Sequence, residues 1–137
     1  MLSKALIARV KQHEGFRDEA YLDTEGVLTV GFGTNLESRL FSEDECEGWL
    51  FEDLDTAFDE LCGVDVFMFL DKTRREVLIE MVYNLGFSGV MKFKKMWAAI
   101  EVNDFEEAAI QMLDSKWHRQ VGQRAKTLAK LMEDGFE

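Results

Sequence analysis

Apolar residues at the start of the chain recur at the spacing of an amphipathic helix. The residues on this stripe are Leu2, Ala5, Leu6 and Val10. We expect the helix to run to about Glu14, because Gly15 follows it as a typical stop.

The helical spacing changes to a strand-like pattern between residues 20 and 33. This segment predicts a β-hairpin whose turn is Asp23-Thr24-Glu25-Gly26. In the return strand, Thr29 is expected to share one face with Gly31 and Gly33, which would leave open space beside its hydroxyl group. The opposite face is expected to carry Leu28, Val30 and Phe32.

Helical spacing returns in the rest of the chain. Ser42-Glu43-Asp44-Glu45 is a capping box that predicts the start of a long helix, which ends at Gly63. A second helix is predicted from near Asp71 to Gly86, with apolar positions nearly all round it, as in a core helix. Shorter helices are predicted at Phe93 to Val102, Asp104 to Leu113 and Gln123 to Met132, with Trp117 and His118 in the connection before the last one.

The order of these elements predicts an α+β fold with a small N-terminal β-hairpin lobe, a long connecting helix and a C-terminal helical bundle. We expect residues 1–137 to form a single domain. Within it, residues 14–41 would form the β-lobe and residues 42–62 the connecting helix. Residues 63–137 would form a helical lobe that packs with the N-terminal helix.

Composition narrows the possible partners. Hydrophobic residues make up 47% of the chain, enough for a core that needs no disulfide or metal. The net charge is −11, from 27 acidic and 16 basic residues, which argues against nucleic-acid binding because that needs a basic surface. No segment has the uninterrupted apolar run of a membrane span or of a signal peptide.

The two cysteines, Cys46 and Cys62, fall on the long predicted helix. That helix would hold them about 24 Å apart, too far for a disulfide bond. We therefore expect both to be buried, reduced thiols. Neither His13 nor His118 joins them at metal-ligand spacing, so the sequence predicts no metal site and no cofactor.

Glu14, Asp23 and Thr29 place two carboxyl groups and a hydroxyl group around the predicted hairpin. Hydrolysis of a glycosidic bond needs an acid for the leaving oxygen and a base for the water, and a hydroxyl group can hold that water. On spacing alone, a glutamate at a helix end is more often simply solvated. An aspartate in a turn more often serves the turn itself. The residues by themselves leave both interpretations open.

Arg124 lies in the first turn of the last predicted helix, where the helix dipole does not favour a positive charge. An arginine at this position is more easily explained if it pairs with a carboxylate elsewhere. A structural salt bridge and an active-site contact are both compatible with the sequence.

The order Glu14, Asp23, Thr29 resembles the catalytic signature of the T-even-phage-type lysozymes, glycoside hydrolase family 24. The most specific block is Glu14-Gly15 together with the segment from Tyr21 to Gly33. Two further blocks, from Leu78 to Phe93 and from Asp104 to Lys126, are similar to the same family and stand in the same order. The resemblance covers nearly the whole chain and implies a lysozyme-like fold.

By this resemblance, Glu14 would be the general acid that protonates the glycosidic oxygen. Asp23, helped by Thr29, would hold and activate the attacking water and give inversion at the anomeric carbon. Arg124 matches the arginine that contacts the acid in that family. Positions that line the substrate cleft are matched by Glu25, Asn35, Tyr83 and Gln111. The implied substrate is peptidoglycan, cut between N-acetylmuramic acid and N-acetylglucosamine.

The resemblance also implies a biological setting: a monomeric phage endolysin made in the cytoplasm of the host bacterium. Because the sequence shows no signal peptide, a holin-type pore would give it access to the periplasm and the cell wall. A virion-associated wall-piercing lysozyme would carry the same motifs.

Two departures from the family pattern support an alternative, a non-catalytic lysozyme-like module that binds glycan or a protein partner. The stretch between Leu36 and Ser42 is shorter than in the best-known family member, which would reduce the β-lobe and open the cleft. The acidic balance is opposite to the basic charge of that member.

Overall fold

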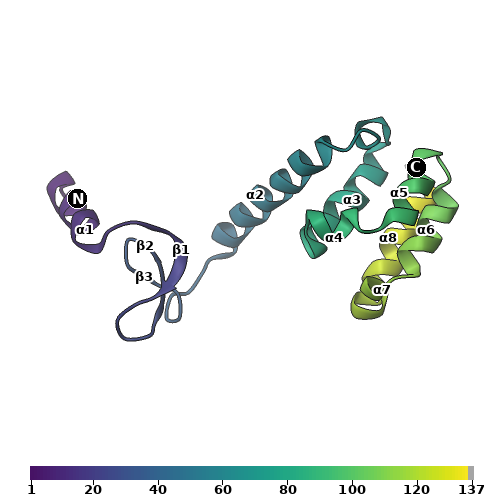
Figure 1. The fold of residues 1–137 in the computed structure, drawn as a ribbon. Coiled ribbons are helices and arrows are strands. Elements are labelled where there is room, and N and C mark those ends of the chain that lie inside the picture. The colour runs from purple at the N-terminus through teal and green to yellow at the C-terminus, as the bar shows by residue number, and fades with distance from the viewer. Residues whose placement is uncertain (136–137) are drawn as a thin grey trace. The chain divides into compact units, whose positions relative to one another are not determined.

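The computed structural model describes residues 1–135, which form two compact units. The N-terminal unit comprises residues 1–46, and the C-terminal unit begins at Glu47. The chain is mostly helical, with one small antiparallel sheet near the N-terminus (Figure 1). This arrangement confirms the predicted α+β class.

The N-terminal unit begins with helix α1 (Lys4–Glu14). Ser3 caps its start, because the Ser3 hydroxyl oxygen accepts a hydrogen bond from the Leu6 amide at 3.1 Å. Gly15 ends it at a positive φ of 71°, a conformation that glycine adopts without steric cost. The helix therefore ends where the sequence predicts.

Three strands follow: β1 (Arg17–Leu22), β2 (Leu28–Gly31) and β3 (Thr34–Asn35). They form one antiparallel sheet in the order β1-β2-β3, so the predicted two-stranded hairpin is wrong in its extent. Phe32 and Gly33 form the turn between β2 and β3 and do not continue the return strand. The cause is local: Gly31 and Gly33 have φ values of 67° and 80°, which reverse the chain.

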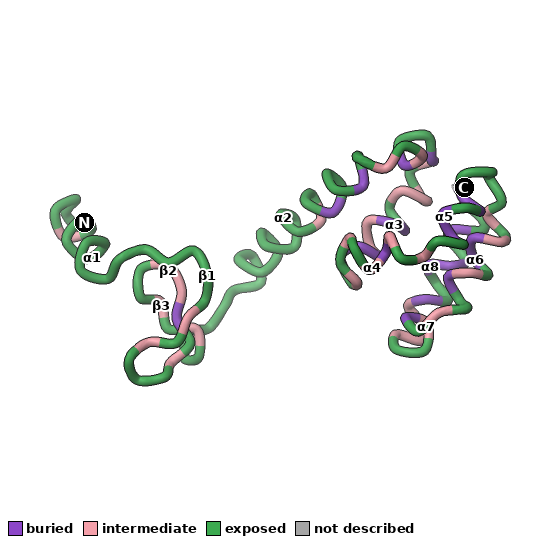
Figure 2. Tube along the Cα trace, viewed as in Figure 1, coloured by how far each residue is buried: buried purple, intermediate pink, exposed green. Residues whose placement is uncertain are grey.

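Thr29 occupies the centre of this small sheet. Its register partners are Tyr21 on β1 and Asn35 on β3. With the N-terminal unit taken by itself, Thr29 is its one buried residue, with 4% of its surface exposed (Figure 2). The unit therefore buries a polar side chain and has no apolar core of its own.

Helix α2 (Glu43–Cys62) starts at the predicted capping box. The Glu45 amide donates to the Ser42 hydroxyl oxygen at 3.0 Å, and three acidic residues occupy the first turn, where the helix dipole favours them. The buried residues of this helix are Ala57 and Leu61. The expectation of buried thiols is wrong: Cys46 and Cys62 are both free and exposed.

The C-terminal unit continues with a short 3-10 helix, η1 (Phe67–Phe69), and six helices. They are α3 (Lys72–Leu85), α4 (Phe87–Met91), α5 (Lys94–Glu101), α6 (Phe105–Leu113), α7 (Lys116–Val121) and α8 (Gln123–Asp134). The predicted bounds hold closely for α3, α5, α6 and α8. Helix α4 was not predicted, and Trp117 and His118 lie within α7 and not in a connection.

The apolar core lies entirely in this C-terminal unit, mainly between α3, α5, α6 and α8 (Figure 2). Four methionines, Met81, Met96, Met112 and Met132, are fully buried there, and their flexible thioether chains fill irregular gaps. Within residues 1–135, no helix combines the length and the apolar character that crossing a bilayer demands.

Candidate active site

Glu14 is the last residue of α1, and its side chain lies directly over Gly33. A Cβ atom built on Gly33 would lie 2.5 Å from the Glu14 Oε2 atom and 2.9 Å from its Cδ atom. Any residue other than glycine would therefore push this carboxyl group away. Because Gly33 has no side chain, the Glu14 carboxyl group can lie against the turn between β2 and β3.

Asp23 stands at the end of β1 and organises the turn to β2. Its Oδ1 atom accepts hydrogen bonds from the Glu25 amide at 2.8 Å and from the Val27 amide at 2.9 Å. Two amide donors on one oxygen fix the orientation of the carboxyl group. Among residues 1–135 the Oδ2 atom has no hydrogen-bond partner, so Asp23 can serve the turn and still offer an acceptor.

The Thr29 hydroxyl group donates to the Val27 carbonyl oxygen at 2.8 Å. Because its proton is engaged, the hydroxyl oxygen can act only as an acceptor toward a further group. The predicted open space lies elsewhere: Thr29 is 4% exposed, whereas a Cβ atom on Gly31 would meet nothing within 4 Å. Gly33 does not share the strand face with Thr29, because it belongs to the following turn.

The two support residues expected in the N-terminal unit are both exposed. Glu25 lies in the turn that Asp23 organises, and only its backbone amide is engaged. The Asn35 Oδ1 atom accepts from the Glu37 amide at 2.8 Å and from the Ser38 amide at 3.1 Å. Asn35 therefore caps the turn after β3 and leaves its side-chain amide N–H groups available.

Arg124, on α8, pairs with a residue that the sequence did not single out. Its Nε atom lies 2.9 Å from the Glu80 Oε2 atom on α3, with both side chains partly exposed. Glu80 and Tyr83 are three residues apart on α3, so they lie on the same face of the helix. This spacing from a candidate residue could have indicated Glu80 as the partner of Arg124. The expected contact between Arg124 and Glu14 stays a prediction.

Tyr83 and Arg124 line one cavity of about 500 Å³ in the C-terminal unit. Its apolar part is formed by Leu50, Leu54, Phe58 and Ile79. The predicted cleft residue Tyr83 thus lies beside the Arg124–Glu80 pair and an apolar surface. Such a surface can bind a sugar through both its faces and its hydroxyl groups.

Gln111 lies in a different cavity of about 560 Å³. Its Nε2 atom donates to the Glu107 Oε1 atom at 2.7 Å, which fixes the side chain. In the same region the Trp117 indole N–H donates to the Asn84 Oδ1 atom at 2.7 Å and joins α7 to α3. No motif or spacing in the sequence indicated this bond.

Within the part of the chain that the structure describes, no three His, Cys, Asp or Glu side chains converge as a ligand set.

The chain is similar to known proteins over most of its length. The pattern of the phage lysozyme family matches residues 11–133. Two relatives from Dictyostelium discoideum, named "Probable T4-type lysozyme 2" and "Probable T4-type lysozyme 1", are 28% and 26% identical, and each comparison covers 92% of both chains. Each alignment runs over 156 positions, more than the 137 residues of this chain, so these relatives carry residues that it lacks.

A third relative is the pre-baseplate central spike protein Gp5 of Enterobacteria phage T4. It is 25% identical over 92% of this chain, and the match spans 27% of that larger protein. The family match covers most of the chain and includes Glu14, Asp23, Thr29 and Arg124. The chain therefore belongs to the phage lysozyme family and is a lysozyme-type glycosidase.

Proposed function

We propose that this lysozyme is an inverting muramidase that hydrolyses the β-1,4 bond between N-acetylmuramic acid and N-acetylglucosamine in peptidoglycan. The observation that carries the proposal is the position of the Glu14 carboxyl group against Gly33, in the same compact unit as Asp23 and Thr29. The candidate acid, Glu14, thus lies at the end of α1, and the candidate base, Asp23, lies at the end of β1 in the same unit.

In this mechanism Glu14 is the general acid. Its proton moves to the glycosidic oxygen as the bond from that oxygen to the anomeric carbon breaks. The side chain is exposed at the end of α1, where a glycan strand can reach it. The close fit over Gly33 limits the directions in which the carboxyl group can point, and a fixed direction favours proton transfer to one oxygen.

Asp23 and Thr29 prepare the water. The Asp23 Oδ2 atom accepts one water proton, while Oδ1 stays bound to the amides of Glu25 and Val27. The Thr29 oxygen accepts the other water hydrogen, since its own proton is given to the Val27 carbonyl oxygen. The oxygen lone pair of the water is then directed at the anomeric carbon, on the side opposite the leaving group.

The remaining matched residues hold the glycan. Tyr83 offers an aromatic face and a hydroxyl group beside the Arg124–Glu80 pair, and Asn35 and Gln111 offer amide groups. Glu25 adds an acceptor in the turn of Asp23. We assign the protein to the lysis of a bacterial host as a monomeric endolysin, released from the cytoplasm to the wall through a holin-type pore. The non-catalytic alternative is not retained, because the chain belongs to a family of lysozymes.

The direct test is substitution of the acid. Glu14→Gln keeps the shape of the side chain and removes its proton, so release of reducing ends from purified peptidoglycan should fall by about 10²-fold or more. Glu19→Gln is the matched control, because Glu19 is an exposed glutamate on β1 outside the proposed site. Circular dichroism establishes that both variants fold. A Glu14→Gln variant with full activity would overturn the proposal.

The stereochemical assignment has its own test. Proton NMR of the first products distinguishes an α-configured new reducing end, expected for inversion, from the β-configured end that retention would give. If the β-anomer formed first, Asp23 would act as a nucleophile and not as a base, with Glu14 still the acid.

A further inference from the structure

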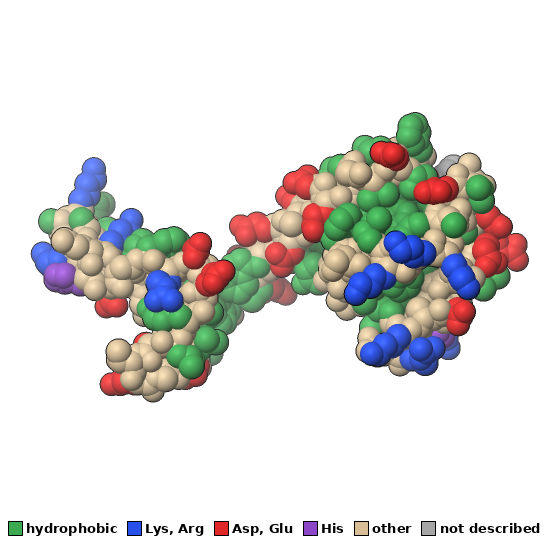
Figure 3. Space-filling model, viewed as in Figure 1, with side chains coloured by type: hydrophobic (Ala, Val, Ile, Leu, Met, Phe, Trp, Pro, Cys, Tyr) green, Lys and Arg blue, Asp and Glu red, His purple; other side chains and the backbone are tan. Residues whose placement is uncertain are grey.

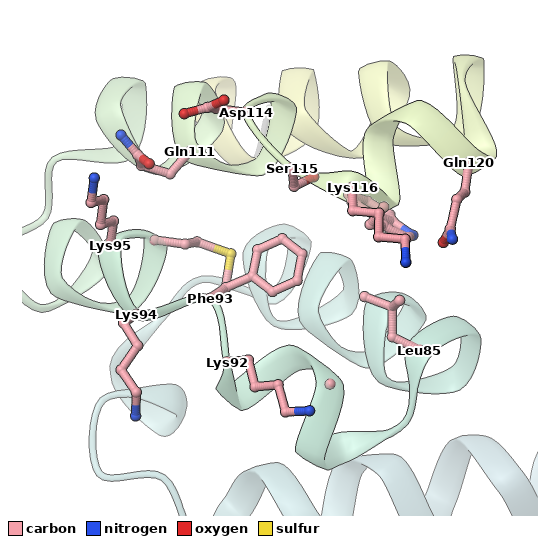
Figure 4. Close-up of a pocket in the computed structure, with 13 residues that line it drawn as sticks. Leu85, Lys92, Phe93, Lys94, Lys95, Gln111, Asp114, Ser115, Lys116 and Gln120 are labelled. Atoms are coloured by element: carbon pink, nitrogen blue, oxygen red, sulfur yellow. The ribbon is translucent and has the colours of Figure 1, made fainter.

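The end of α2 and the 3-10 helix η1 bring two sulfur-containing side chains together. The Cys62 thiol donates a weak hydrogen bond to the Met68 thioether, with 3.9 Å between the Sγ and Sδ atoms. Both residues are exposed, Met68 to 50%. The cavity of about 560 Å³ offers no such pair, since Met96 is the one sulfur-containing residue among residues 1–135 that lines it (Figure 4).

The chain on either side of this sulfur pair is fixed by the core. The residues directly before the two sulfur residues, Leu61 and Phe67, are both fully buried there. Backbone hydrogen bonds close the connection between them: the Val64 amide donates to the Leu61 carbonyl oxygen at 2.9 Å, and the Phe67 amide donates to the Val64 carbonyl oxygen at 3.0 Å. A ligand that contacts both sulfur atoms therefore does not have to order a flexible loop.

The separation of the two sulfur atoms matches that of two ligands on one metal ion. Two sulfur atoms that each lie about 2.3 Å from a metal ion, at an angle of about 120°, are about 4 Å apart. Thiolate and thioether groups are soft ligands, and they favour Cu(I) over magnesium, calcium or manganese. Those harder ions need several oxygen or nitrogen ligands, and within residues 1–135 no three His, Cys, Asp or Glu side chains come together.

The charge around the sulfur pair favours a cation. The sequence has no Lys, Arg or His between Arg39 and Lys72, whereas α2 is rich in Asp and Glu. Figure 3 shows acidic side chains along α2, while the Lys and Arg side chains visible on the C-terminal unit lie over the helices that follow it. A negative surface raises the local concentration of positive ions.

We propose that Cys62 and Met68 form a binding site for one soft monovalent metal ion, Cu(I). On binding, the Cys62 sulfur atom releases its proton to the solvent and forms a bond to copper, and the Met68 sulfur atom donates a lone pair. Copper stays in the +1 state, so the step needs no oxidant or reductant. The site contains none of the residues of the proposed muramidase mechanism and is independent of it.

The test supplies Cu(I) to the full chain as its ferrozine complex, in the absence of oxygen. Loss of the visible absorption of that complex measures the copper transferred, and we expect one tightly bound ion per chain. Isotope-labelled methionine methyl groups then identify the thioether by NMR: the Met68 signal should shift, and that of the buried Met96 should not. Failure of an excess of protein to take up copper, or an unchanged Met68 signal, would overturn the proposal.

Matched variants distinguish the sulfur pair from a single reactive thiol. Cys62→Ser should abolish tight binding, and Met68→Leu, which keeps the thiol and the size of the side chain, should weaken it by about tenfold or more. Cys46→Ser is the control, because Cys46 is also a free, exposed thiol on α2 and has no sulfur contact among residues 1–135. It should bind copper as the wild type does. Equal losses in the two cysteine variants, or none in Met68→Leu, would reject the paired site.

Two comparisons complete the test. Zn(II) prefers four ligands, so an equal concentration of it should not displace Cu(I) from two sulfur atoms. Displacement by Zn(II) would place the metal among the acidic side chains and reject the sulfur pair. Glu14→Gln should bind Cu(I) as the wild type does, so loss of glycan hydrolysis and loss of copper binding are separate outcomes.

Discussion

Gly33 sets how closely the Glu14 carboxyl group approaches the sheet. Two separate constraints act on the residue at this position. The backbone has a φ of 80°, and a Cβ atom built there would lie 2.5 Å from the Glu14 Oε2 atom. The first concerns the backbone and affects stability. The second concerns the position of the proposed acid and affects activity.

Gly33→Ala should therefore lower both quantities. The left-handed backbone costs about 1–2 kcal/mol of unfolding free energy for a residue with a Cβ atom. Displacement of the Glu14 carboxyl group should in addition lower kcat by about 10²-fold, because misplacing a catalytic group by about 1 Å has an effect of that size. Urea unfolding and the release of reducing ends measure the two effects.

Gly31→Ala separates the two constraints. Gly31 has a φ of 67°, so the backbone cost is similar, but a Cβ atom there meets nothing within 4 Å. We expect a comparable loss of stability with kcat reduced less than threefold. A loss of kcat in Gly31→Ala as large as in Gly33→Ala would show that backbone strain, and not contact with Glu14, causes the effect.

Thr29 provides the second prediction for a single residue. Thr29→Val replaces the hydroxyl group by a methyl group of similar size. The Val27 carbonyl oxygen keeps its bond from the Asp23 amide at 2.9 Å, so the loss of stability should stay near 1 kcal/mol. The rate should fall tenfold or more, since the water loses its acceptor, whereas Thr29→Ser should keep most of it. A fully active Thr29→Val variant would exclude the hydroxyl group from the mechanism.

The sequence identified candidate residues better than it identified their partners. Glu14, Asp23 and Thr29 follow from a short motif within one segment of chain, where order and spacing carry the information. The partner of Arg124 is Glu80, 44 residues away, and only packing of α3 against α8 brings the two together. The position of Glu14 over Gly33 likewise depends on a turn that the alternating pattern did not reveal.

At the scale of elements, Arg74 links the start of α3 to the end of α8 by hydrogen bonds. Its Nε atom donates to the Met132 carbonyl oxygen at 2.6 Å, and its Nη2 atom donates to the Glu133 carbonyl oxygen at 2.7 Å. The guanidinium group also pairs with Asp71 at 3.1 Å and stacks on the Phe105 ring at 3.5 Å. One side chain thus satisfies carbonyl groups that a helix end leaves unpaired.

Arg74→Met should lower the unfolding free energy by about 2–3 kcal/mol. Methionine keeps much of the apolar stem but leaves the two carbonyl oxygens and Asp71 without the guanidinium donors. Arg119→Met is the control, because Arg119 is exposed in the last turn of α7 and should cost less than about 0.5 kcal/mol. Urea unfolding followed by circular dichroism compares the two. Equal urea midpoints for the two variants would show that the hydrogen bonds of Arg74 contribute nothing to stability.

The sequence predicted the ends of helices with clear capping residues to within a few residues. It did not predict the short elements. Helix α3 has Asp71 as its N-cap, whose side chain accepts from the Arg74 amide, and Gly86 as its stop. Helices α4 and α7 have five and six residues, too few to show a helical period, and β3 has two. Helices α4 and α7 pack against α3 and α8, and β3 pairs with β2. One segment of sequence does not reveal such contacts with other segments.

At the scale of the whole molecule, apolar burial is divided unequally between the two units. Among residues 1–135, the 21 residues of the buried apolar core all belong to the C-terminal unit, from Ala57 to Met132. Helix α1 buries none of its residues, and the sheet buries Thr29 alone, with each unit taken by itself. Apolar burial is the main favourable contribution to folding, so the two units should differ in their stability as separate fragments.

Separate fragments test this difference. A fragment of residues 42–137 keeps the Ser42 cap of α2 and the whole core, and we expect it to unfold in one cooperative thermal transition with strong helical circular dichroism. A fragment of residues 1–46 has one small sheet and no apolar core, and an isolated sheet of this size is marginal in water. It should show narrow amide dispersion in NMR spectra. Well-dispersed amide signals from residues 1–46 alone would show that the turns at Asp23 and Asn35, together with the paired strands, stabilise the sheet without an apolar core.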